Sequence, residues 1–77
     1  MNELTVNLGK RIKELRKKNN ISQEKLAFLA ELDRTYVNSV ENGKRNISII
    51  NIGKIANSLN TDLPNFFDSD YFRNEDI

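Results

Sequence analysis

The run from residue 33 to residue 39 reads Asp-Arg-Thr-Tyr-Val-Asn-Ser, so polar side chains surround a single valine. Arginine can donate two parallel hydrogen bonds to guanine, asparagine can pair with adenine, and the threonine methyl group can touch that of thymine. A helix that only faced water would more often carry glutamate and lysine, and such a solvated polar face is the alternative interpretation. We therefore predict that Arg34, Thr35 and Asn38 read DNA bases.

Further polar residues on either side of this run suit contacts with a phosphate backbone. Ser22 and Gln23 stand where a helix is predicted to begin, and the free N–H groups of a helix N-terminus attract anions. Helix capping is a compatible role for these two residues. Lys44 and Arg45 follow the predicted reading helix, with a solvated basic loop as the alternative. The predicted backbone or groove contacts are Ser22, Gln23, Tyr36, Ser39, Asn42, Lys44 and Arg45.

Helices must position these side chains, since apolar residues recur every three or four positions along the chain. Asn20 and Gly43 suit helix ends, because both tolerate a left-handed backbone. Ser22 and Asp33 can cap helix starts. The first three predicted helices span about residues 4–18, 22–32 and 33–42. The second and third are joined by so few residues that they predict a helix-turn-helix, whose second helix enters the major groove of DNA.

The remaining apolar residues predict a fourth and a fifth helix. Ser48 can cap the fourth helix. Its inner stripe is Ile49, Ile52, Ile55, Ala56 and Leu59. Pro64 suits the first turn of a short fifth helix, and residues 68–77 form a polar, acidic tail that is predicted to fray. We expect an all-α single domain over residues 1–77, with its core at about residues 5–67.

The isoleucines near residue 50 are too numerous for one stripe of a single helix. At about 100° per residue, Ile50 points well away from the face that carries Ile52 and Ile55. A second apolar surface of this kind predicts self-association. The predicted homodimer interface consists of Ile47, Ile50, Leu63, Phe66 and Phe67. The alternative is that the fifth helix simply folds over this surface within one chain.

Arg16 and Glu41 stand beside predicted core positions at the ends of the first and third helices. A salt bridge between them would pin the third helix to the first. If the pair is partly buried, its value is mainly positional, because the removal of one partner strands a charge. We predict this structural role, rather than DNA contact, for both residues.

The composition excludes several classes of protein. The 77 residues contain no cysteine and no histidine, so disulfides, thiolate zinc sites and histidine general bases are excluded. We expect no catalytic residue, no metal and no cofactor. No apolar run approaches the roughly 18 residues of a membrane span, and no signal-peptide pattern is present, so we expect a cytoplasmic protein without membrane contact.

The charged residues are unevenly distributed along the chain. Lysine and arginine concentrate in residues 9–54, whereas acidic residues outnumber them in residues 55–77. Such an asymmetry is expected when one face of a protein meets a polyanion. A solvated basic helix face would produce the same asymmetry and is the alternative.

The sequence resembles the Cro/repressor-type helix-turn-helix family over about residues 8–67. The resemblance lies in three segments, in order and at the right spacing: Arg16-Lys17-Lys18, Ile21-Ser22-Gln23-Glu24-Lys25-Leu26-Ala27 and Glu41-Asn42-Gly43-Lys44-Arg45. It implies a compact five-helix, lambda-repressor-like DNA-binding domain. It also implies that Gln23 contacts phosphate or a nearby base, and that Arg16 and Glu41 form the internal ion pair.

Within that family, residues 32–38 and 45–48 resemble the controller proteins of restriction-modification systems. This resemblance implies a small homodimer that binds double-stranded operator DNA upstream of its own gene and the endonuclease gene, and activates or represses them by occupancy. It implies DNA contacts at Arg34, Thr35, Tyr36 and Arg45, and pairing of subunits through the last two helices. RNA polymerase is a further candidate partner. The alternatives with the same fold are a phage-type or host repressor and an antitoxin; a protein–protein adaptor is more distant.

Three positions depart from the pattern of the family. Asn20 and Glu31 stand where relatives commonly have glycine. A residue other than glycine at positive φ costs on the order of 1 kcal/mol, so we expect the turn at Glu31 to have a different shape. Asn38 stands where relatives often carry serine, and we expect it to alter base preference.

Overall fold

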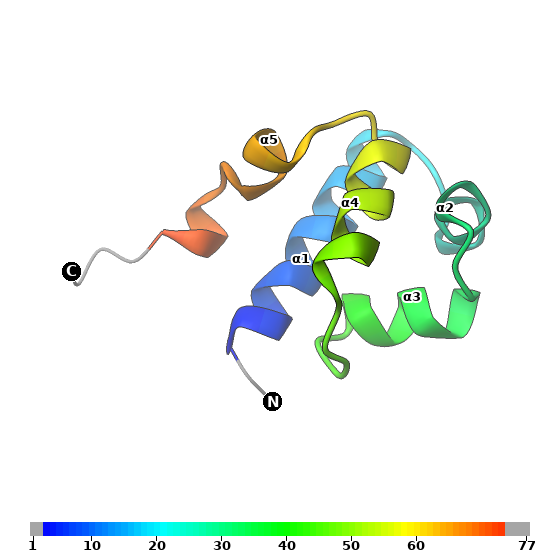
Figure 1. Cartoon of the computed structure of the whole chain (residues 1–77), viewed down its shortest axis with the longest axis horizontal. Helices are drawn as coiled ribbons and strands as arrows, with labels where there is room; N and C mark the ends of the chain where they lie inside the picture. Colours follow the sequence, from blue (N-terminus) through cyan, green and yellow to red (C-terminus); the bar gives the residue numbers. More distant parts are fainter. Residues whose placement is uncertain (1–2, 74–77) are drawn as a thin grey trace.

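Five α-helices and one short 3-10 helix make up residues 3–73, the part of the chain that the computed structural model describes (Figure 1). They are α1 (Glu3–Lys18), α2 (Gln23–Ala30), α3 (Arg34–Glu41), α4 (Ile49–Ser58), α5 (Leu63–Phe67) and η1 (Asp70–Phe72). Helix α3 packs against both α1 and α2, while α4 packs against α2 and α5. In Figure 1, α2 and α3 lie at one end of the molecule and α5 lies toward the other. The predicted all-α class is confirmed.

Side-chain caps begin α2, α3 and α4 at the predicted positions, and a further cap begins α5. The Oγ of Ser22 accepts from the N–H of Lys25, and the carboxylate of Asp33 accepts from the N–H of Thr35. Ser48 caps α4 in the same way, and Asp62 caps α5, whose second residue is proline. Each cap satisfies a backbone donor that the helix itself leaves free.

Each of the first three connections between helices contains a residue in the left-handed conformation: Asn20 has φ 58°, Glu31 has φ 56° and Gly43 has φ 72°. The predictions for Asn20 and Gly43 are confirmed. The expectation of a differently shaped turn at Glu31 is wrong, because this residue adopts the conformation that glycine would. The N–H groups of Glu31 and Leu32 donate to carbonyls of α2, and these hydrogen bonds hold the left-handed residue in place.

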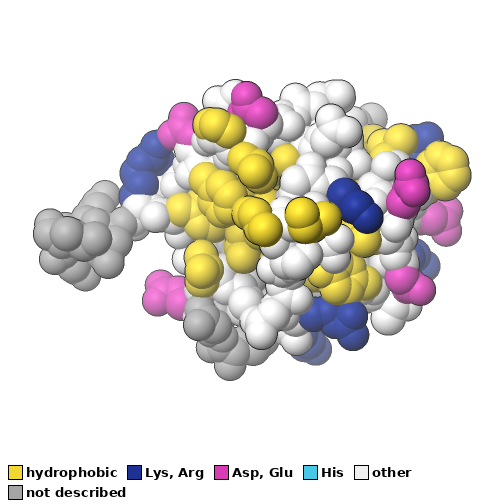
Figure 2. All heavy atoms as spheres, viewed as in Figure 1, with side chains coloured by type: hydrophobic (Ala, Val, Ile, Leu, Met, Phe, Trp, Pro, Cys, Tyr) yellow, Lys and Arg dark blue, Asp and Glu magenta, His cyan; other side chains and the backbone are white. Residues whose placement is uncertain are grey.

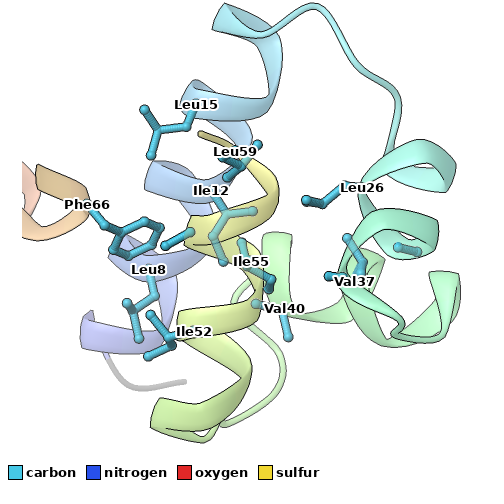
Figure 3. Close-up of a cluster of buried hydrophobic side chains, with 13 residues drawn as sticks. Leu8, Ile12, Leu15, Leu26, Val37, Val40, Ile52, Ile55, Leu59 and Phe66 are labelled. Atoms are coloured by element: carbon cyan, nitrogen blue, oxygen red, sulfur yellow. The ribbon is translucent and has the colours of Figure 1, made fainter. Parts of the chain in front are cut away.

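The core is one cluster of apolar side chains drawn from all five α-helices (Figure 3). Ile12 of α1, Leu26 of α2 and Ile55 of α4 are fully buried within it. Ile49, in contrast, is exposed, so its predicted place on the inner stripe is wrong. It is the first residue of α4, at the edge of the core. None of the helices within residues 3–73 is long and apolar enough to cross a membrane.

The C-terminal segment extends the core beyond the predicted limit at residue 67. Phe72 packs against the core, and its ring centroid lies 5.0 Å from that of Phe67. Predicted fraying is therefore wrong for residues 68–73, and residues 74–77 lie outside the described part of the chain. Phe66 is fully buried. Its predicted place in a homodimer interface is wrong, because α5 folds over the core of its own chain.

Arg11 holds α5 against α1. Its Nε donates to the carbonyl oxygen of Phe66 at 2.8 Å, and its Nη2 donates to that of Asn65 at 2.9 Å. The carbonyl of Asn65 also accepts from the N–H of Asp68 at 3.2 Å, and the guanidinium adds a second donor at the end of this short helix. Arg11 therefore positions α5 on α1.

Candidate nucleic-acid interface

The α2–α3 unit presents the predicted base-reading residues outward. Val37 and Val40 of α3 are buried, and they hold this helix against the core. Arg34, Thr35 and Asn38 lie on the same helix and are all exposed. The turn of residues 31–33 that joins the two helices is as short as the sequence predicts. This arrangement is that of a helix-turn-helix with the outer face of its second helix open to solvent.

A surface hollow of about 260 Å³ lies where α3 meets the start of α2. Its lining residues are Gln23, Arg34, Thr35 and Asn38. The fold therefore brings the three predicted base-reading residues together with a predicted phosphate contact from the neighbouring helix. All four side chains carry hydrogen-bonding groups and one is cationic, which suits a base edge beside a phosphate group.

The predicted ion pair between Arg16 and Glu41 is present beneath the end of α3. The Nε of Arg16 lies 2.7 Å from one carboxylate oxygen of Glu41, and Nη2 lies 3.0 Å from the other. The side chain of Glu41 is only 1% exposed and that of Arg16 is 12% exposed. The hydrogen bond to Glu41 raises the pKa of the Arg16 guanidinium above its usual range, so the arginine stays charged. The pair joins α1 to α3, as predicted.

Gly9 allows α1 to approach the end of α3. A Cβ atom at this position would lie 2.4 Å from the carbonyl oxygen of Val40, and 2.5 Å from that of Glu41. Any larger residue would push the two helices apart and would separate the two partners of the ion pair. Gly9 was not among the predicted residues, although a glycine inside a helical pattern is a recognised sign of close packing.

A continuous chain of side-chain hydrogen bonds leads from the ion pair to the outer surface of α3. The Nε2 of Gln23 donates to Oε1 of Glu41 at 3.0 Å. The Nδ2 of Asn38 donates to Oε1 of Gln23 at 3.1 Å, and the Nδ2 of Asn42 donates to Oδ1 of Asn38 at 3.2 Å. We call this hydrogen-bonded series, in the order Glu41, Gln23, Asn38 and Asn42, the Glu41–Asn42 chain. The sequence identified each member separately and missed their connection.

Tyr36 is held at both its ring and its hydroxyl group. The guanidinium carbon of Arg45 lies 5.1 Å from the centroid of the ring, a distance typical of a cation–π contact. The Nδ2 of Asn51, in the first turn of α4, donates to the hydroxyl oxygen at 3.1 Å. Asn51 is a site residue that sequence reasoning missed. Its only signal was a polar side chain in a mostly isoleucine segment.

The remaining predicted contacts lie around α3 without forming one cluster. Ser22 is exposed at the start of α2, with its hydroxyl engaged as a cap. Ser39 is half-buried on α3. Lys44 and Arg45 are exposed just beyond the C-terminal end of that helix. Cations and a helix N-terminus therefore flank the reading helix at different ends of the motif.

Comparison with known proteins identifies the family. The helix-turn-helix family model matches residues 12–66. The control protein C.MunI of Mycoplasma sp is 46% identical over 68 residues, which cover 87% of this chain and 92% of that protein. This chain belongs to the control proteins of the helix-turn-helix family. The predicted resemblance to restriction-modification controllers is thereby confirmed.

Solved structures of control proteins agree with this assignment. The restriction-modification controller protein C.AhdI from Aeromonas hydrophila has a TM-score of 0.79 and 48% identity, over 82% of this chain and 96% of that one. The controller protein C.Esp1396I has been crystallised as a tetramer with its natural 35 base-pair operator. That structure has a TM-score of 0.83 and 31% identity to this control protein, over 87% of this chain and 88% of that one.

Proposed function

We propose that this control protein is a homodimeric transcriptional regulator that binds operator DNA and controls expression of its own operon, including a restriction endonuclease. The observation that carries the proposal is the hollow at the α2–α3 junction, where Arg34, Thr35 and Asn38 meet Gln23. The operator-bound tetramer of C.Esp1396I supports it, because that relative shares the fold at 31% identity.

In this proposal, α3 enters the major groove and its exposed residues divide the work of recognition. Arg34, Thr35 and Asn38 read bases. Tyr36 packs on the sugar-phosphate chain beside the reading helix. The residues that set the register on phosphates are Ser22, Gln23, Ser39, Asn42, Lys44 and Arg45. Two copies of α3 in a dimer would reach half-sites about 34–36 Å apart.

Exposed apolar side chains on α4 and α5 support the homodimer. Ile49 is 58% exposed, Ile50 is 68% exposed and Leu63 is 36% exposed. Figure 2 shows hydrophobic side chains gathered over this part of the molecule. Ile47 and Phe67, which the sequence also assigned to the interface, are half-buried and pack against the core. We propose that the contact surface centres on Ile49 and Ile50.

Gly53 supports the same surface. It lies inside α4, where glycine is about 0.8–1.0 kcal/mol less favourable than alanine. A Cβ atom there would meet no other part of residues 3–73 within 4 Å outside its own stretch of helix, so packing within this part of the chain does not require a glycine. It follows Ile49 by four residues and Ile50 by three, and therefore lies on the same side of the helix. We propose that the backbone of a second copy approaches at this point.

The similar proteins named above are regulators, and we propose that this chain likewise acts by binding rather than by catalysis, in the cytoplasm. Contact with RNA polymerase is a further proposal for the case in which the bound protein activates transcription.

Footprinting on the DNA upstream of its own gene tests the proposed function. We expect protection of paired half-sites, with centres separated by about one helical turn or a multiple of it. Selective binding only at DNA elsewhere would favour a phage-type repressor or an antitoxin. The absence of any sequence-selective DNA binding would overturn the proposal and favour a protein–protein adaptor.

A further inference from the structure

All hydrogen bonds of the Glu41–Asn42 chain run in the same donor-to-acceptor direction, toward Glu41. The buried carboxylate of Glu41 sets this direction. A carboxylate can only accept hydrogen bonds. Gln23 must therefore turn its NH2 group toward Glu41, where the two atoms lie 3.0 Å apart. The reverse orientation would place the amide oxygen of Gln23 against a buried negative charge. Arg16 pairs with the same carboxylate, with its Nε 2.7 Å from one oxygen.

The orientation of Gln23 determines the orientation of Asn38. The amide oxygen of Gln23 faces α3 and accepts from Nδ2 of Asn38 at 3.1 Å. Asn38 in turn points its own oxygen toward Nδ2 of Asn42 at 3.2 Å. An amide has two donor hydrogens and two lone pairs, so Asn38 retains one of each. Its side chain is exposed and lines the hollow.

We propose that Glu41, without touching DNA, fixes through Gln23 which way round Asn38 presents its amide to a base. Adenine offers an acceptor and a donor in a fixed order in the major groove, whereas guanine offers two acceptors. An amide that is locked in one orientation matches adenine in one register and rejects the reversed pattern. Glu41 and Gln23 are thus positioning residues for base recognition. The inference rests on the proposed function, because Asn38 must face a base.

Substitutions that remove the hydrogen bond on one side of Asn38 or the other separate this positioning role from simple packing. Gln23→Met removes the link between Glu41 and Asn38 but leaves the Arg16–Glu41 pair intact. Asn42→Ala, the matched control, removes only the exposed end of the chain. Both substitutions lower overall affinity, since both residues are proposed backbone contacts. The readout is therefore the ratio of affinities among operators that carry each of the four bases at every position.

We expect Gln23→Met to reduce discrimination at the position read by Asn38 by about tenfold. Asn42→Ala should preserve that discrimination, because Gln23 still orients Asn38. In the free protein, the NH2 resonances of Asn38 should move in Gln23→Met while the rest of the spectrum shows a folded chain. The double variant Gln23→Met/Asn38→Ala should lose no more discrimination than Asn38→Ala alone.

The outcomes distinguish the two proposals. If Asn38→Ala lowers base preference while Gln23→Met does not, or if Asn42→Ala lowers it as much as Gln23→Met, then the positioning role is overturned. If Asn38→Ala changes no preference but the protein still selects its operator, the inference fails and the proposed function stands. If the unmodified protein selects no DNA sequence, the proposed function itself fails.

Discussion

The outer face of α3 and the first turn of α4 are both exposed to solvent. They differ in whether their side chains find suitable contacts within a single chain. Around α3, Gln23 and Asn38 are hydrogen-bonded in a chain that ends on a buried ion pair. At the start of α4, Ile49 and Ile50 are more than half exposed. Polar groups can satisfy one another and still meet a ligand, whereas an exposed apolar side chain is satisfied only when another surface covers it.

This difference has consequences for binding. A polar surface whose side chains are already ordered loses less conformational entropy when DNA arrives. An apolar surface that needs a second copy makes assembly depend on protein concentration. The α3 surface is thus suited to setting specificity, and the α4 surface to making occupancy respond to the amount of protein.

Glu41→Ala should produce the largest effect, and it disrupts the hydrogen-bonded surface of α3. The substitution strands the charge of Arg16 and removes the acceptor of Gln23, so we expect a loss of about 3–5 kcal/mol in the free energy of unfolding. Urea denaturation measures this loss. The double variant Arg16→Met/Glu41→Leu is the control and should lose much less, because it leaves no unpaired charge. Wild-type stability in Glu41→Ala would show that the pair does not hold α3.

Ile50→Glu tests the exposed apolar surface at the start of α4. Ile50 is 68% exposed, so the free energy of unfolding of the monomer should change little. The dimer should dissociate, and operator affinity should fall about 100-fold because the second half-site is no longer held nearby. Sedimentation measures the dissociation. Leu29→Glu, at an exposed apolar position of α2, should leave the dimer intact. An intact dimer in Ile50→Glu would place the interface elsewhere.

Arg34→Ala should weaken operator binding by about 1–3 kcal/mol and relax preference at one base position. Arg45→Ala is the informative partner variant. It should weaken binding to all sequences alike, and should reduce the slope of log affinity against log salt by about one unit. Titrations at several salt concentrations measure both effects. Unchanged base preference in Arg34→Ala would contradict its role as a reader.

Gly53→Ala should have the smallest effect and the most specific one. The monomer should become more stable by about 0.8–1.0 kcal/mol, since alanine favours the helix and its Cβ meets no other described part of the chain within 4 Å. The dimer should become weaker, because the new methyl group lies where the second copy approaches. Unfolding experiments measure the gain in monomer stability, and sedimentation measures the loss in dimer affinity. A dimer of undiminished strength would place Gly53 outside the contact.

The local features of the fold were predictable from the sequence because they depend on neighbouring residues. Ser22 and Asp33 cap their helices where the pattern predicts, and Gly43 has the expected positive φ. The apolar spacing also assigned Val37 and Val40 correctly to the core. Glu31 shows the limit of this reasoning. Its residue type argues against a left-handed turn, yet the hydrogen bonds at the end of α2 impose one.

The sequence by itself determined which residues face outward on α3, because helical periodicity needs only the order of side chains. The tertiary structure alone decided which of them meet. Asn38 bonds to a residue 15 positions away, and Gln23 to one 18 positions away. Arg11 reaches the carbonyl of Phe66 across 55 positions, and the ring of Phe66 lies in the core of its own chain. Periodicity fixes directions around one helix axis, but the distances between helices depend on how the whole core packs, down to the absent side chain of Gly9.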